Sequence, residues 1–195
     1  MNISLSELRK NASIKGVILG IALTVLSVFS YYFIVSIAAS FWTISFGPFL
    51  FSAVIPIAIA SVFCTDLRKK AGGFWTFKQA ATGIFVMFLV SYAVKFVTYD
   101  LLFTKVIEPN SVEKVRTVMM DATTKMLEKS GADQDKIDEQ MAKMEKGFKD
   151  QEEKSAVSVI TGIAISLIFI FVIALIFAAI FKKYPPPVQI SDATV

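Results

Sequence analysis

Side chains that do chemistry are scarce in this sequence. Its 195 residues include no His and a single Cys, Cys64. Without His the chain lacks the commonest general base and metal ligand, and one Cys forms neither an intrachain disulfide nor a cysteine metal site. Phosphate-loop, His-Glu metal and nucleophile-elbow motifs are absent from the sequence as well. We therefore expect no enzyme activity, no cofactor and no metal, and we interpret Cys64 as a small buried thiol.

Lys95 and Pro56 are the residues within the apolar segments that a function could use. Lys95 is the only charge inside a predicted span, and a lone intramembrane ionisable residue is by default a candidate for contact with a substrate or ion. It also lies 17 residues beyond Lys78, about 25 Å along a helix, where a long side chain can snorkel to the opposite interface. Pro56 falls in mid-span and predicts a kink, which serves either a gate or packing. Both interpretations stay open for each residue.

Methionines gather in the one long polar segment of the chain. Methionine adapts its shape and is overused at binding surfaces, so these residues are candidate partner contacts. Five of the seven methionines lie there, namely Met119, Met120, Met126, Met141 and Met144.

Two apolar series in the same segment have helical spacing. One consists of Val115, Met119, Ala122 and Met126, and the other of Ile137, Met141, Met144 and Phe148. Each series predicts a helix with one apolar seam, and residues 129–133 between them carry helix-stop and N-cap signals, so we expect an αα-hairpin. The methionines then either fill the hairpin seam or contact a partner. Met120 lies off the seam, which keeps a partner contact open as an alternative.

Long apolar blocks define the fold class. The chain is 55% hydrophobic with a mean hydropathy of +0.63, and its apolar residues come in runs that only lipid can cover in a chain this short. The runs are Gly16–Trp42, Phe46–Thr65, Phe77 to at least Val94, and Ala156–Phe181. We predict an all-α membrane protein of four transmembrane helices with an extracytoplasmic hairpin between spans three and four. The expected units are residues 1–104 with three spans, 105–155 with the hairpin, 156–183 with the fourth span, and a disordered tail at 184–195.

Basic residues predict the orientation of the spans. Nine of them fall on one side of a four-span topology: Arg9, Lys10, Lys15, Arg68, Lys69, Lys70, Lys78, Lys182 and Lys183. The positive-inside rule makes that side cytoplasmic, so we expect both termini in the cytoplasm and a multi-pass protein of a bacterial inner membrane.

Small residues recur at the spacing that lets helices approach closely in lipid. Gly16 and Gly20 form a GxxxG motif, and two similar pairs lie in the last span, Gly162 with Ser166 and Ala174 with Ala178. Packing between spans of one chain and dimerisation both explain these motifs.

The layout resembles a known bacterial membrane family. The shared features are the basic loop leading into residues 73–80, Gly-Phe-Trp-Thr-Phe-Lys-Gln-Ala, with Gly83 following. They also include a polar segment rich in Met, Glu and Lys with Ser-Gly-Ala-Asp at residues 130–133, and a last span that ends in a Lys pair. These features resemble the domain of unknown function number four-one-nine-nine. The resemblance implies the topology, and it implies no reaction and no site residues.

The sequence therefore favours a non-enzymatic membrane protein that acts through its hairpin, in a structural or interaction role. Its expected partners are the lipid bilayer and either a second copy or another membrane protein. Nucleic acid is not expected, because the basic residues flank apolar blocks instead of forming a patch on a soluble face. The alternative is a small transporter or channel subunit, in which Pro56 would supply a gate and Lys95 a substrate contact.

Overall fold

The computed structural model describes residues 4–37, 41–152 and 156–185. Within these ranges every regular element is helical, and the only β-type pairing is an isolated bridge between Trp75 and Lys183. Four helices are long and apolar enough to cross a membrane: Leu5–Ser36, Phe41–Lys70, Phe77–Ile107 and Val157–Phe181. The prediction of an all-α protein with four spanning helices is confirmed. The tail predicted to be disordered lies mostly outside the described residues.

The first two spans are long helices joined near residues 38–40. Helix α1 (Leu5–Tyr32) starts at Ser4, whose side chain accepts a hydrogen bond from the Glu7 backbone N–H, and continues as a π-helical segment, η1 (Phe33–Ile37). The second span consists of α2 (Phe41–Phe49), the π-helical η2 (Leu50–Val54) and α3 (Ile55–Lys70). Pro56 is the second residue of α3, two positions after the end of η2. Because Pro56 has no N–H to donate, the wider π-turn before it is the local response to the proline.

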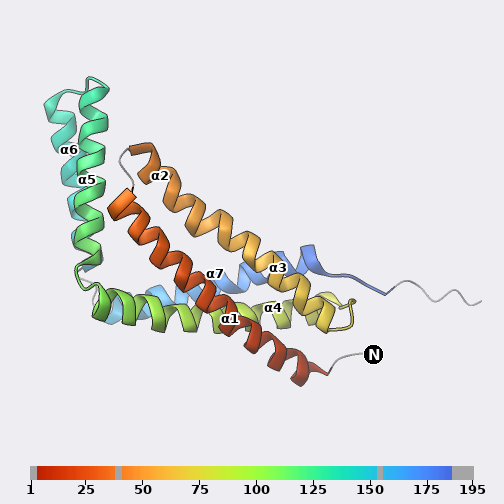
Figure 1. Cartoon of the computed structure of the whole chain (residues 1–195). Helices are drawn as coiled ribbons and strands as arrows, with labels where there is room; N and C mark the ends of the chain where they lie inside the picture. Colours follow the sequence, from red (N-terminus) through yellow and green to blue (C-terminus); the bar gives the residue numbers. More distant parts are fainter. Residues whose placement is uncertain (1–3, 38–40, 153–155, 186–195) are drawn as a thin grey trace, which may run out of the picture.

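The third span extends past Val94, the minimum end predicted for it, and leads into the polar segment. It consists of α4 (Phe77–Lys95) and the π-helical η3 (Phe96–Ile107). Two helices of the polar segment follow, α5 (Ser111–Lys129) and α6 (Gln134–Glu152), and the last span is α7 (Ala156–Phe181). In Figure 1, α5 and α6 stand side by side at the far end of η3, and α5 runs past the ends of the first two spans.

The core lies where α1 crosses α4, with α3 and α7 packed around this crossing. A Cβ atom added to Gly16 would lie 2.6 Å from the carbonyl oxygen of Met87, and one added to Gly20 would lie 2.7 Å from Cβ of Val94. The two helices therefore touch at a distance that only glycine allows. This places the GxxxG motif inside the chain, in the packing of one span against another. By contrast, a Cβ added to Gly162 would meet nothing within 4 Å.

A clasp at one end of the bundle joins the third and fourth spans. Trp75 is 2% exposed, and its indole Nε1–H donates a hydrogen bond of 2.7 Å to the carbonyl oxygen of Phe181. The backbone N–H of Trp75 donates to the Lys183 carbonyl at 2.9 Å, and the Lys183 N–H donates back at 3.3 Å. The chain reaches this position through a turn at Gly72 and Gly73, whose φ angles are 96° and 83°. Residues with a Cβ atom rarely adopt such positive φ angles. We call these contacts the Trp75 clasp.

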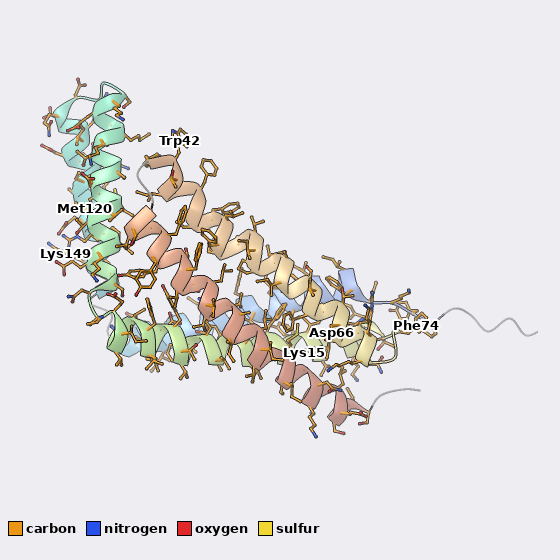
Figure 2. All side chains as sticks on the ribbon, viewed as in Figure 1. Lys15, Trp42, Asp66, Phe74, Met120 and Lys149 are labelled. Atoms are coloured by element: carbon orange, nitrogen blue, oxygen red, sulfur yellow. The ribbon has the colours of Figure 1, made fainter. Side chains whose placement is uncertain are left out.

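The same end of the bundle carries further polar contacts. Thr76 and Gln79 form a reciprocal capping box at the start of α4, and Lys15 of α1 makes a salt bridge to Asp66 of α3. Figure 2 shows Lys15, Asp66 and Phe74 toward this end, with Trp42, Met120 and Lys149 toward the other. The predicted basic side and the hairpin therefore lie at opposite ends of the spans.

Candidate functional site

Helix α5 contacts the spans along one face. It packs against α2 and η1, the two segments where the first span leads into the second. Ala122, 8% exposed, lines a surface recess together with Met126 of α5 and with Phe41 and Trp42 of α2. Val115 lies nearer the start of α5 and lines two cavities next to the spans. This contact fixes the hairpin against the aromatic end of the bundle.

A second face of α5 contacts α6. Arg116 makes a salt bridge to Glu145, and the Thr124 hydroxyl donates a hydrogen bond of 3.2 Å to the sulfur of Met141. Met120 follows Arg116 by four residues and precedes Thr124 by four, so it lies on the same stripe of α5, which faces α6.

Most of the seam predicted for α5 therefore lies against the spans. Val115, Ala122 and Met126 of that seam lie beside the spans, whereas the stripe through Met120 meets α6. The reason is physical: a helix with two neighbours carries two partly apolar stripes, and spacing alone does not say which stripe meets which neighbour. The five candidate methionines are all half-buried, and they are Met119, Met120, Met126, Met141 and Met144.

A polar junction ties the hairpin to the first span. The carboxylate of Glu108 accepts a hydrogen bond of 2.7 Å from Lys114 Nζ, one of 3.4 Å from the Tyr31 hydroxyl and one of 3.3 Å from the Tyr32 hydroxyl. The hydrogen bond from Lys114 holds the pKa of Glu108 below its usual range, and the same bond raises the pKa of Lys114. Phe103, 4% exposed, packs edge-on against both tyrosine rings.

Sequence reasoning missed this junction. The available signals were the Tyr31–Tyr32 pair at the end of an apolar block, typical of a membrane interface, and the acidic Glu108 just before a helix start. Neither signal indicates that Tyr31 and Glu108, which lie 77 positions apart in the sequence, form a hydrogen bond.

Lys95 and Pro56 line one cavity. It has a volume of about 240 Å³, lies between α1, α3, α4 and α7, and its walls are almost entirely apolar. Leu23 of α1, Ala60 of α3 and Phe177 of α7 contribute to these walls. The structure therefore brings together the two intramembrane residues that the sequence singled out.

Lys95 also lines a second cavity, of about 310 Å³, on the side toward the hairpin. Its lining residues include Ser27, Ser30, Ser52 and Tyr99. Nζ of Lys95 lies 5.5 Å from the centroid of the Tyr99 ring, in cation–π contact. Lys95 thus stands at the border between an apolar cavity and a hydroxyl-lined one.

A third cavity, of about 230 Å³, shares Tyr31, Tyr99 and Val115 with the second and lies under the hairpin. Ser111 at the start of α5 lines it, and the Ser111 hydroxyl is buried without a hydrogen-bond partner. The series of cavities therefore runs from the apolar space between the spans to the base of α5.

Metal-ligating groups do not cluster in the part of the chain that the structure describes: no three His, Cys, Asp or Glu residues there could share an ion. Cys64 is fully buried in the core around α3. The chemistry of the described site is therefore that of one amine, several hydroxyls and apolar walls.

Spans and site together define a multi-pass helical membrane protein with a polar hairpin. The sequence matches the family described as a protein of unknown function (DUF4199) over residues 15–183, and the chain belongs to this family. The family identified from residues 73–80 and the last span is thereby confirmed. No curated protein and no solved structure matches the chain.

Proposed function

We propose that the protein acts in the membrane without catalysis, as a structural or interaction protein whose contact element is the α5–α6 hairpin. The observation that carries this proposal is the attachment of α5 on two sides, to the spans and to α6. A helix held in this way keeps a fixed direction relative to the membrane. It leaves the outer face of α6, with exposed charges such as Asp138, Lys143 and Lys146, free for a partner.

The nine basic residues at the opposite end support an orientation with both termini in the cytoplasm. In this orientation the hairpin lies on the outer side of a bacterial inner membrane. Its charges are mixed in sign, which suits translocation of the segment and contact with a protein surface.

A photo-crosslinking residue placed at Lys146 tests this function. Lys146 is exposed on the outer face of α6, so we expect discrete adducts to a second copy or to another membrane protein. The same residue at Met120, on the stripe of α5 that faces α6, should react only within the chain. Equal adducts from both positions, or none from Lys146 in a folded protein in its own membrane, would contradict the proposal.

A second function, that of a small transporter or channel subunit, is supported by the single cavity that contains Lys95 and Pro56. Purified protein in vesicles would be assayed for the flux of a broad panel of small solutes. We expect Lys95→Met to lower the flux of the transported solute, whereas Lys105→Met, on the exposed surface of η3, should leave it unchanged. Absence of flux through the unchanged protein would eliminate this second function.

A further inference from the structure

The apolar cavity beside Lys95 opens to the lipid. Two residues of its lining, Ile57 and Phe169, are 56% and 64% exposed on the surface of the spans. They lie on α3 and α7, so the opening lies between these two helices. Since the surface of a span is covered by acyl chains, whatever fills this cavity enters from the bilayer.

The shape and chemistry of this cavity suit a hydrocarbon chain. Its walls come from Leu19, Leu23, Phe88 and Ile173, among others, and expose almost no polar surface. A polar solute would lose its hydration there without replacement hydrogen bonds, which is costly. A hydrocarbon segment pays no such penalty.

Lys95 adds a positive charge at one end of this cavity. Its position, 17 residues beyond Lys78, places the amine about 25 Å along the helix, just below the outer headgroup region. Ser27 and Ser30 line the neighbouring cavity, so hydroxyl groups that can donate hydrogen bonds to an anion lie near the charge of Lys95. Burying an amine at this depth is unfavourable unless a counter-charge accompanies it.

We propose that the two cavities joined by Lys95 form a binding site for an anionic amphiphile of the bilayer. One acyl chain occupies the apolar cavity between α1, α3, α4 and α7. The anionic head, a phosphate or a carboxylate, lies against Lys95 and the serine hydroxyls. The two volumes, about 240 and 310 Å³, together fall within the range of roughly 300–1,000 Å³ of small-ligand sites.

This site goes beyond the contact function proposed for the hairpin and requires no transport. A free inorganic anion would leave the apolar cavity empty, and a neutral hydrocarbon would leave the charge of Lys95 without a bound partner group. Only a molecule with a hydrocarbon chain and an anionic head matches both the apolar cavity and the cavity lined by Lys95 and serines. The site also explains why the single charge of the predicted spans lies at the border of the apolar cavity.

Native mass spectrometry of the full-length protein tests the proposal. The protein is exchanged into nanodiscs with equal amounts of phosphatidylglycerol and phosphatidylcholine of matched acyl chains, and the lipids retained after gentle release are counted. A parallel sample receives oleate in place of phosphatidylglycerol. We expect the unchanged protein to retain an anionic amphiphile in preference to phosphatidylcholine. Retention of phosphatidylglycerol identifies a phospholipid head, and retention of oleate identifies a free carboxylate.

Four variants separate the head contact from the chain contact. Lys95→Met should lower the preference for the anionic amphiphile about fivefold, the usual effect of one basic residue near anionic lipid. Lys105→Met removes the same charge from an exposed position of η3 and should preserve the preference. Ala60→Leu fills the apolar cavity and should reduce retention of the amphiphile, whereas Ala58→Leu, on the exposed surface of the same helix, should not.

Three results would overturn the proposal. The first is an unchanged protein that retains neither anionic amphiphile in preference to phosphatidylcholine. The second is an equal loss of preference in Lys95→Met and Lys105→Met, because a surface charge effect would then suffice. The third is full retention in Ala60→Leu. Circular dichroism and gel filtration of each variant verify that the fold is intact, and Ala60→Ser replaces Ala60→Leu as a second variant that makes the cavity polar if the larger residue does not fold.

Discussion

A single methyl group at Gly16 should loosen the crossing of α1 over α4. A Cβ atom there would lie 2.6 Å from the Met87 carbonyl oxygen and 2.8 Å from Cβ of Val90. Both distances are shorter than van der Waals contact, and the carbonyl belongs to the backbone of α4, so a change of side-chain rotamer cannot relieve the clash. The two helices must move apart, and this separates the buried core residues on either side of the crossing.

The magnitude follows from two opposing effects. Overpacking of a core costs about 1–3 kcal/mol, while replacing Gly by Ala within a helix gains about 0.5–1 kcal/mol. Gly16→Ala should therefore lower the free energy of unfolding by roughly 1–2 kcal/mol. Gly20→Ala should act similarly, since its Cβ would lie 2.9 Å from the Ser91 carbonyl oxygen. The double variant should lose less free energy of unfolding than the two single variants together. Once the first methyl group has separated the helices, the second one clashes less.

Unfolding by sodium dodecyl sulfate in mixed micelles, followed by circular dichroism, measures these differences. The matched control is Gly162→Ala, because Gly162 has the same small-residue spacing in α7 but open space around it. This control should be neutral or gain up to about 1 kcal/mol of helix propensity. If Gly16→Ala were as stable as Gly162→Ala, the close contact of α1 and α4 would be refuted.

Three further predictions concern single side chains. Trp75→Phe should lower the free energy of unfolding by about 1–3 kcal/mol, because the last carbonyl of α7 loses its indole donor; the exposed Trp42→Phe is the control in the same detergent unfolding assay, and equal effects would contradict the clasp. The pKa of Glu108 is lowered by the hydrogen bond from Lys114, so this contact should stabilise the protein above the unfolded-state value of about 4.3 and be lost as the pH falls through the folded-state pKa. Glu108→Gln should remove this part of the pH dependence, and identical profiles of stability against pH would refute the assignment. Ser111→Ala should leave thermal stability unchanged or higher, because a buried hydroxyl without a partner is removed; a lower melting temperature would reveal a partner for that hydroxyl.

The spans could be predicted because they follow from run length alone. An uncharged apolar run has one favourable environment, and the break between runs is fixed by charge and by Gly or Pro. The depth of Lys95 could be estimated in the same way, from residue counting along one helix. These quantities depend on local sequence and do not require knowledge of which helices touch.

Features that depend on pairing between distant helices could not be predicted. The cavity beside Lys95 exists because four spans leave space between them. The sequence around Lys95 does not indicate that Leu23 and Phe177 line the same cavity. The neighbour of the Met120 stripe could not be predicted for the same reason. Its periodicity was visible, but the choice between α6 and the spans belongs to tertiary packing.

The Trp75 clasp also bears on how the chain is made. Its two halves lie 106 residues apart, and the second half follows the last span. A chain that is synthesised from its N-terminus has Trp75 in place long before Phe181 leaves the ribosome, so the indole stays without its acceptor until the fourth helix has been inserted. Closure of the clasp therefore marks completion of the bundle. A chain arrested before the fourth helix would lack the Phe181 carbonyl, and the Trp75 indole would have to find another acceptor.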